Sequence, residues 1–445
     1  MYTFKEGIYT DVRIEDVYET RIQFTLGKID ECAVRKYKAG FIRVFDGQRW
    51  YYASTSEVEN IQQEIDTLSE LASPKGNIQE NAIYTKLQAN TGTYPVFENR
   101  SVTLIPLEQK LALLKDYFPA LEANKTITMW NTAYMDQRKV KYFYSSKGAN
   151  LQWDTQRCGF RLNFDMAEGD KKFSESFQKG GSCFEELENH KEAFKEKLTQ
   201  CEDFLQNSVP VEPGKYTVIL SPLAAGIFAH ESFGHKSEAD FMVGDENMKK
   251  EWAIGKKVGS DILSIIDDGN EAGNGYIPFD DEGSQAAKTW LIKDGILQGR
   301  LHSCSTAADL EEPATGNARA LNFEFEPIVR MTTTYIGTGT HSKEQLFKEV
   351  KNGLYIDTIR HGSGMSTFTM APSLAYRIRD GKITEPMRIA VISGTVFDTL
   401  SQIDGLSDQL ELLSFVTGGC GKMDQAPLPV GFGGPYVRVN NMDVQ

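Results

Sequence analysis

The sequence predicts an α+β protein made of two domains. Its 445 residues are too many for one ordinary hydrophobic core. Strand-like alternation and helix-like spacing of apolar residues follow one another in blocks, which is typical of an α+β chain. The stretch SVPVEPGK at 208–215 has two prolines and a glycine and is the best linker. We therefore expect an N-terminal domain over 1–208 and a C-terminal domain over 209–445.

The N-terminal domain is expected to open with an antiparallel meander. Short apolar runs alternate over 10–53 and are interrupted by glycine-containing turns. Ser56 and Glu59 then form a capping-box pattern at the start of a helix, and a second helix is predicted from Pro106. Residues 126–177 return to strand patterning.

One long amphipathic helix is expected to close this domain. Apolar residues from Phe184 to Leu205 recur at three- and four-residue steps. The helix would place Cys183 and Cys201 on a structural element, with Cys201 on its packed face. All six cysteines are dilute and form no C-x-x-C pair, which favours reduced thiols over disulfides.

Composition excludes several classes of protein. A hydrophobic content of 40% describes a folded chain rather than a disordered one. The formal charge of −14 repels phosphate backbones, so no direct nucleic-acid binding is expected. No stretch approaches the roughly 18 apolar residues that cross a bilayer, and the first residues lack the apolar region of a signal peptide. We therefore expect a cytoplasmic protein without a membrane partner.

The second domain is expected to begin with a strand and a buried helix. Strand-like residues 215–220 precede Ser221, which suits the N-cap of a helix. Residues 223–229 are apolar on every face of that helix, so it must be buried. His230 and Glu231 continue it, and ionisable groups in such surroundings need a partner because an unpaired buried charge is costly.

His230, Glu231 and His235 form a His-Glu-x-x-x-His pattern that can mark a metal site. A pair of histidines at this spacing also arises by chance, but histidine is scarce here and the helix is buried. Residues four apart lie about 40° apart around a helix, whereas five residues separate the side chains by about 140°. A shared metal therefore requires a one-residue π-bulge, or a helix that ends at Gly234.

A catalytic zinc site needs a third protein ligand besides the two histidines. The sequence offers several residues for this role: Glu238, His302, Cys304, His361 and Cys420. Glycines on both sides of Cys420 let its backbone approach another segment closely, which favours it modestly.

Several motifs together resemble the TldD/PmbA family of zinc metallopeptidases, historically described as modulators of DNA gyrase. They are HESFGHKSEADF (230–241), FDDEG (279–283), TGNAR (315–319), EPIVRMTTTYI (326–336) and the ending GGCGK…APLPVGFGGPYVRVNNM. The resemblance is most specific over 215–445. It implies an N-terminal α/β domain, a C-terminal domain rich in curved antiparallel sheet, and assembly as dimers.

The resemblance also implies the roles of individual residues. Zn²⁺ would be held by His230, His235 and Cys420, with Glu231 as the general base that activates a zinc-bound water. Because the chain keeps HExxxH and the cysteine, it resembles the catalytic TldD type rather than the companion type that lacks the motif. The chain would form a dimer either with a second copy of itself or with such a companion.

Three other segments offer side chains that could take part in the site. The family often has a Gly-Gly run where this chain reads TIRHGSGMST, which leaves substrate preference open; His361 lies there. Asp280, Asp281 and Glu282 invite comparison with paired catalytic carboxylates, but adjacent residues point apart, so a structural or substrate-lining use is favoured. Asn317 and Arg319 either hold a loop or bind peptide backbone or a terminal carboxylate.

The predicted function is zinc-dependent hydrolysis of unfolded or short peptides. The alternative is a non-catalytic peptide-binding or scaffold subunit of such a dimer. Replacement of Glu231 distinguishes the two, because only hydrolysis needs a general base.

Overall fold

The computed structural model describes residues 2–416 and 418–445 as a mixed α+β fold whose largest N-terminal element is a curved sheet. The sheet has seven strands in the order β3-β2-β1-β5-β6-β4, and β7 pairs with β6. Their bounds are β1 (Tyr9–Thr25), β2 (Lys28–Phe45), β3 (Trp50–Thr55), β4 (Thr91–Tyr94), β5 (Ile127–Ser145), β6 (Asn150–Glu168) and β7 (Lys171–Gly181). All neighbours are antiparallel except β4 and β6. The predicted meander is confirmed, and both predicted groups of strands share this one sheet.

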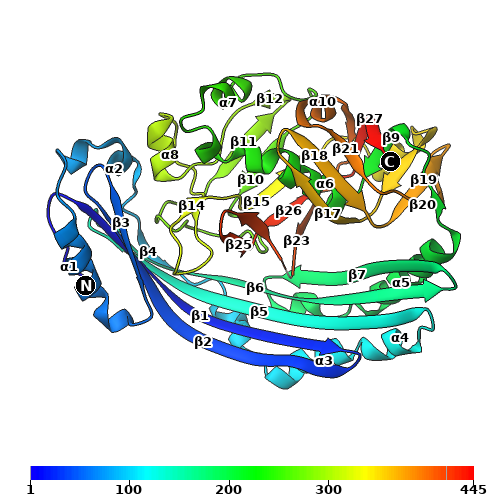
Figure 1. The fold of residues 1–445 in the computed structure, drawn as a ribbon, viewed down its shortest axis with the longest axis horizontal. Coiled ribbons are helices and arrows are strands. Elements are labelled where there is room, and N and C mark those ends of the chain that lie inside the picture. The colour runs from blue at the N-terminus through cyan, green and yellow to red at the C-terminus, as the bar shows by residue number, and fades with distance from the viewer. Residues whose placement is uncertain (1, 417) are drawn as a thin grey trace.

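The helices around this sheet are α1 (Ile61–Leu71), α2 (Ala82–Lys86), α3 (Leu107–Lys115), α4 (Phe118–Ala123) and α5 (Lys191–Asn207). Two helices, α3 and α4, lie on the side of the sheet away from the C-terminal half, two others, α1 and α2, lie at its end near the N-terminus, and α5 packs along β7 and also contacts β20 (Lys382–Arg388) (Figure 1). Apolar side chains of α3, α4 and α5 pack against β5 and β6 in one buried cluster, which includes Leu114, Phe160 and Phe194. Cys201 is fully buried in that cluster, as its position on the apolar stripe predicted.

Two of the predicted helices are shorter than expected. The prediction of one long helix from Phe184 is wrong, because a 3-10 turn (Phe184–Leu187) comes first and α5 begins only at Lys191. Asn189 breaks the run with a φ of 65°, a left-handed conformation that asparagine tolerates better than most residues. The helix predicted from Pro106 is also divided, into α3 and α4, although Asp116 and Tyr117 between them keep right-handed backbone conformations.

The capping box predicted at Ser56 and Glu59 is also wrong. A 3-10 turn (Val58–Asn60) separates Ser56 from α1, and no side chain caps that turn. The amide of Glu57 instead donates a hydrogen bond to the hydroxyl oxygen of Thr55. Because Glu59 belongs to this turn rather than to the first turn of α1, the two residues cannot cap the helix.

The C-terminal half contains two larger sheets. A ten-stranded sheet has the order β17-β18-β21-β27-β9-β16-β19-β20-β8, with β22 paired to β27. Its strands are β8 (Val209–Pro210), β9 (Gly214–Leu220), β16 (Asn352–Ile356), β17 (Ile359–Gly364), β18 (Thr367–Pro372), β19 (Ala375–Arg379), β20 (Lys382–Arg388), β21 (Ile392–Thr395), β22 (Ile403–Leu406) and β27 (Val437–Val444). Most pairs are antiparallel, but β9 with β16 and β8 with β20 are parallel. The expected antiparallel sheet is therefore mixed.

A six-stranded sheet, two short hairpins and five helices complete this half. The sheet, in the order β12-β11-β10-β15-β26-β23, comprises β10 (Ile265–Asp268), β11 (Lys288–Lys293), β12 (Ile296–Leu297), β15 (Thr333–Ile336), β23 (Glu411–Ser414) and β26 (Gly431–Gly434). The hairpins pair β13 (Ala318–Arg319) with β14 (Ile328–Val329), and β24 (Cys420–Lys422) with β25 (Gln425–Leu428). The helices are α6 (Pro222–Ala229), α7 (Glu246–Glu251), α8 (Cys304–Asp309), α9 (Lys343–Lys348) and α10 (Val396–Ser401).

The C-terminal half lies on the concave side of the N-terminal sheet (Figure 1). Buried residues on both sides of position 208 pack together, among them Phe204 with Ile219 and Tyr355 in one cluster. The division into domains 1–208 and 209–445 stays a prediction. None of the described helices is long and apolar enough to span a bilayer.

Candidate metal centre

The helix that leads to the histidines is buried as predicted. Ser221 caps α6 by accepting a hydrogen bond from the amide of Ala224, and proline occupies the first turn. Every residue of α6 except Leu223 is buried. A Cβ on Gly226 would lie 2.5 Å from the backbone nitrogen of Gly433, so glycine is what lets α6 pack directly on β26.

A π-helix over His230–Gly234 resolves the odd spacing of the two histidines. The amide of His235 donates to the carbonyl of His230, five residues earlier. One extra residue in the turn brings both imidazoles to the same face, and their ring centroids are 5.0 Å apart. The predicted departure from α-helical geometry is therefore confirmed. Gly234 has ordinary helical φ and ψ, but a Cβ there would lie 2.1 Å from Sδ of Met331.

Cys420 joins the two histidines across 185 residues of sequence. One nitrogen of His230, one of His235 and Sγ of Cys420 all lie within 4.8 Å of one another, and Sγ is 3.6 Å from Nε2 of His235. Nδ1 of His230 is buried without a hydrogen-bond partner among the described residues. A buried imidazole with a nitrogen that has no hydrogen-bond partner fits a metal ligand. Two imidazoles and one thiolate leave a fourth position open in a tetrahedral site.

The other residues considered as a third ligand lie elsewhere. His302 contacts Thr306 and Glu312, and Cys304 is buried against Ser284. His361 is exposed on β17. Glu238 does reach the site, but it contacts the far side of the His235 ring rather than the shared space between the three side chains.

The electrostatics of the site favour a thiolate. Burial alone would raise the pKa of the Cys420 thiol, but the charges and hydrogen bonds of His230 and His235 lower it to about 5. Burial opposes the charged form of His235, yet its contacts with Cys420 and Glu238 raise its pKa to about 10. The thiolate is the form of cysteine that binds metals, so this environment prepares Cys420 for that role.

Glu238 and Lys422 form a charged layer behind the histidine. Oε2 of Glu238 lies 3.4 Å from Nδ1 of His235 and 3.1 Å from Nζ of Lys422. Lys422 also pairs with Asp240 at 2.7 Å and donates to the carbonyl of Val329. A carboxylate on the outer nitrogen of a histidine orients the ring and makes it a more basic ligand.

Arg330 holds the hairpin that carries Cys420. Its side chain is fully buried and donates to the carbonyls of Cys420, at 2.6 Å, and Gln425, at 3.0 Å. Sequence reasoning missed this residue. The signal that could have found it was a charged side chain in the apolar, strand-like run IVRMTTTYI.

Asn317 and Arg319 hold the same region together. Asn317 donates to Asp267 at 2.9 Å and to the carbonyl of Arg330 at 3.0 Å. Arg319 donates to the carbonyls of Met331, at 2.5 Å, and Pro429, at 2.7 Å. These contacts are those of loop-holding residues, which was one of the two uses considered for them. Substrate binding by either residue stays a prediction.

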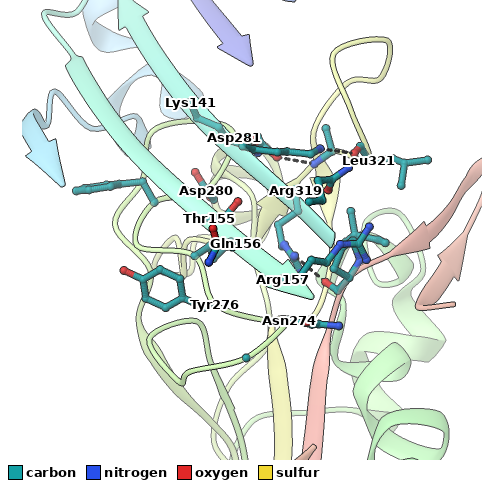
Figure 2. Close-up of a pocket in the computed structure, with 18 residues that line it drawn as sticks. Lys141, Thr155, Gln156, Arg157, Asn274, Tyr276, Asp280, Asp281, Arg319 and Leu321 are labelled. Carbon is teal, nitrogen blue, oxygen red and sulfur yellow. Dashed lines mark hydrogen bonds and ion pairs between the residues drawn. The ribbon is translucent and has the colours of Figure 1, made fainter. Parts of the chain in front are cut away.

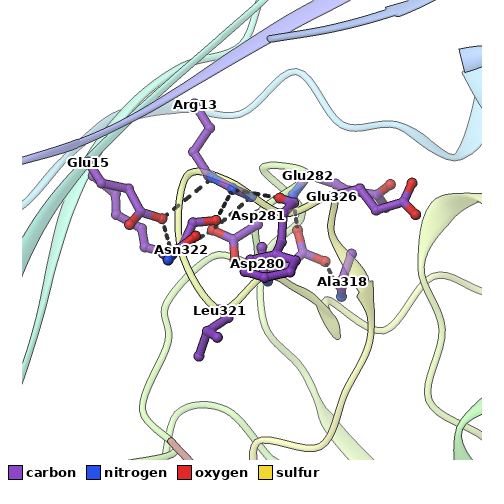
Figure 3. A network of polar contacts seen from close by, with 12 residues as sticks. Arg13, Glu15, Asp280, Asp281, Glu282, Ala318, Leu321, Asn322 and Glu326 are labelled. Atoms are coloured by element: carbon purple, nitrogen blue, oxygen red, sulfur yellow. Dashed lines mark hydrogen bonds and ion pairs between the residues drawn. The ribbon is translucent and has the colours of Figure 1, made fainter. Parts of the chain in front are cut away.

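Two of the three carboxylates of FDDEG, those of Asp281 and Glu282, hold the two halves of the molecule together, and Asp280 holds the loop (Figure 3). Asp280 accepts hydrogen bonds from the amides of Glu282, Ser284 and Ala318. Asp281 pairs with Lys141 of β5 at 2.5 Å. Glu282 pairs with Arg43 of β2 at 2.9 Å, and that arginine also binds Asp11. Every one of these carboxylates has a structural partner, which supports the structural use, and Asp280 and Asp281 also line a cavity.

Glu231 lies at the start of the π-helix under the hairpin of β17 and β18. It is half-buried, and no described residue forms a hydrogen bond or ion pair with its carboxylate. Two glycines of β17 pack against it: a Cβ would lie 3.1 Å from Cγ of Glu231 at Gly362, and 2.7 Å from its carbonyl oxygen at Gly364. The carboxylate is therefore positioned by close packing and kept free of partners.

The sequence of this chain matches those of known proteins. Residues 213–445 match the PmbA/TldA metallopeptidase C-terminal domain, and residues 10–72 match PmbA/TldA metallopeptidase domain 1. A metalloprotease of Methanocaldococcus jannaschii is 31% identical over 97% of this chain and 96% of its own length. The chain belongs to the PmbA/TldD metallopeptidase family.

Further relatives agree with this assignment. The zinc metalloprotease TldD homolog of Saccharolobus solfataricus is 26% identical over 98% of this chain and 96% of its own length. The crystal structure of TldE from Thermococcus kodakarensis has the same fold, with a TM-score of 0.79 at 17% identity, over 98% of this chain and 96% of that one. This TldD-family protein is a metalloprotease, and its His-His-Cys cluster is the candidate metal centre.

Proposed function

We propose that this metalloprotease is a zinc-dependent peptidase that hydrolyses unfolded or short peptides. The observation that carries the proposal is the meeting of the ligand atoms of His230, His235 and Cys420 within 4.8 Å. Glu231 follows His230 in the chain, and no described residue pairs with its carboxylate. The matching relative in Saccharolobus solfataricus is named a zinc metalloprotease, which supports zinc as the ion.

The three side chains suit zinc by their chemistry. Neutral imidazole and thiolate are the nitrogen and sulfur donors that zinc prefers, and three protein ligands leave one position for water or substrate. When bound, zinc would polarise the scissile carbonyl and lower the pKa of water towards about 7. Glu238 would fix the tautomer of His235, so that Nε2 faces the ion.

Glu231 is assigned the role of general base. It takes a proton from the attacking water and passes it to the leaving amine. A free carboxylate beside the ligands fits this role better than a paired one, because an ion pair would stabilise its charged form and make it a weaker base. The packing of β17 against Glu231 would also limit where the carboxylate can move.

The decisive experiment is Glu231→Gln. Glutamine keeps the shape of the side chain but cannot take a proton, so we expect cleavage of an unfolded polypeptide to fall by about 10²–10⁴. Zinc content and unfolding temperature should match wild type, because Glu231 is not a proposed ligand. Glu251→Gln, on an exposed part of α7, is the matched control for the lost charge. If zinc-loaded wild type cleaves no faster than Glu231→Gln, the non-catalytic, peptide-binding role replaces this proposal.

We propose that the chain assembles as a dimer, either of two identical copies or of one copy with a family member that lacks HExxxH. Direct binding of nucleic acid and of membranes is not part of the proposal. Light scattering of the purified chain, alone and with a co-expressed companion, measures the assembly. A monomer under both conditions contradicts it.

A further inference from the structure

A small polar cavity lies between the N-terminal sheet and the hairpin of Cys420. It has a volume of about 50 Å³. Because a water molecule needs roughly 10–15 Å³ of such space, the cavity has room for one small polar group or a few waters. Its walls come from β5, β6, the loop around Tyr276, and the segment Arg319–Leu321 (Figure 2). Leu428 and Pro429 close it, and Leu428 pairs with Cys420 in the hairpin, so the cavity adjoins the metal centre.

Most charged groups around this cavity are already paired. Lys141 binds Asp281, and Lys139 lies 3.2 Å from Glu15. Asp280 and Asp281 accept backbone amides. The remaining cations are Arg157 and Arg319, which line the cavity next to each other (Figure 2).

Among the residues that the structure describes, no carboxylate forms an ion pair or hydrogen bond with either arginine. Arg319 donates only to main-chain carbonyls, those of Met331 and Pro429. Arg157 forms no hydrogen bond or ion pair with any described residue, and its Nε is buried without a partner. The negative charge of Glu19 acts on Arg157 and raises its pKa, but the carboxylate of Glu19 pairs with Arg21 and Arg35.

The environment of both arginines disfavours their charge. Burial, together with a neighbouring arginine, lowers the pKa of Arg157 and of Arg319 to about 10. Guanidinium groups remain charged at neutral pH even so, and a desolvated charge that forms no ion pair is costly. At Arg319 the negative charges of Asp281 and Asp267 offset this cost only in part. An anion that entered the cavity would relieve this cost at both residues.

We propose that this cavity binds a carboxylate group of the peptide substrate, through Arg157 and with Arg319 beside it. Arginine presents a planar fork of donors that matches a carboxylate. Arg157 is only partly buried, so a ligand can reach it. The identity of the ligand rests on the proposed peptidase function, but the cavity and its two arginines do not. The carboxylate can come from the C-terminus of a peptide or from an acidic side chain.

The test measures binding rather than cleavage, so that it is independent of catalysis. In the Glu231→Gln background, one fluorescent unstructured peptide is compared in three forms by anisotropy. The forms have a free C-terminal carboxylate, a C-terminal amide, or a C-terminal amide with one internal Gln replaced by Glu. We expect at least one carboxylate form to bind about tenfold more tightly than the plain amide, which corresponds to about 1.4 kcal/mol. The form that gains affinity identifies the source of the carboxylate.

Arg157→Gln should then reduce this ratio towards one, and Arg157→Lys should give an intermediate ratio because it keeps the charge but loses the fork. Arg21→Gln removes the same charge from a half-exposed side chain outside the cavity and should keep the wild-type ratio. Equal affinity for all three peptides, or a ratio that survives Arg157→Gln, overturns the proposal. If the ratio behaves as expected but wild type does not cleave, the proposed function fails while this site stands.

Discussion

The carboxylate of Glu238 lies 3.4 Å from Nδ1 of His235, on the opposite side of the ring from the nitrogen that faces Cys420. Because outer carboxylates of this kind orient a ligand and raise its basicity, we expect Glu238→Gln to weaken zinc binding about 10–100-fold. Competition with a chelator of known affinity measures this loss. Asp240→Asn is the matched control, because Asp240 shares Lys422 with Glu238 but does not contact the histidine. Equal affinities for the two variants would show that the contact with His235 has no role.

The absence of a side chain at position 234 is expected to matter for stability. Gly234→Ala would place a Cβ 2.1 Å from Sδ of Met331, and such overpacking typically costs about 1–3 kcal/mol. Urea unfolding measures the cost. Gly214→Ala, where the nearest atom is 3.7 Å away, should change stability far less.

A double-variant cycle checks the cause of this effect. Met331→Ala removes the obstructing sulfur, so Gly234→Ala should cost less in that background than in wild type. If the cost is the same in both backgrounds, contact with Met331 is not its origin.

Local patterns predicted much of this fold because their causes are local. The meander over 10–53 follows from alternation, and the capped, buried α6 follows from Ser221 and the apolar run after it. The π-helix could be predicted because five-residue spacing and a shared ligand face are compatible in only a few ways. Asn189 is a residue type that can end a helix with a left-handed conformation, but the helical spacing of apolar residues on both sides of it predicted an unbroken helix.

The support around the site could not be read from the sequence, because it depends on contacts between distant segments. Arg330 reaches the carbonyl of Cys420 across 90 residues, and Arg43 reaches Glu282 across 239. Neither residue stands in a local pattern that indicates its partner. Cys420 itself was named through the resemblance to a family, since its flanking glycines alone gave it only a modest advantage over the other candidates.

The buried ion pair of Lys141 and Asp281 joins the N-terminal sheet to the C-terminal half, and it should contribute strongly to the free energy of unfolding. Lys141→Met removes one partner and leaves the carboxylates of Asp281 and Glu15 with less compensation, so we expect a loss of about 3–5 kcal/mol in urea unfolding. Lys195→Met, which removes an exposed pair with Glu192, should cost no more than about 1 kcal/mol. Similar losses in the two variants would contradict a structural role for the buried pair.

The same pair predicts a dependence on pH. Burial raises the pKa of Asp281, but Lys141 and Arg13 outweigh it and hold the pKa well below its ordinary value of 3.8. A carboxyl group with a depressed pKa in the folded state stabilises the protein above its unfolded pKa, and this stabilisation is lost as pH falls below it. Lys141→Met should therefore lose less stability than wild type when the pH falls from about 5 to about 3, a range that brackets the pKa of about 4 of an aspartate in the unfolded chain. Urea unfolding at the two pH values measures the difference. An equal loss in the two proteins would show that the lysine does not control this titration.

The hairpin of β17 and β18 is expected to set the position of Glu231. Gly362→Ala would place a Cβ 3.1 Å from Cγ of Glu231 and 3.1 Å from Cγ2 of Ile227, so the glutamate must shift by a few tenths of an ångström. Small misplacements of a catalytic group lower the rate, and we expect kcat for peptide cleavage to fall about tenfold while KM and zinc content stay near wild type. Ser363→Ala changes the exposed neighbour on the same strand and should leave kcat unchanged. A kcat for Gly362→Ala equal to that of Ser363→Ala would mean that the hairpin does not position the base, whereas loss of zinc would assign the glycine to the integrity of the metal centre instead.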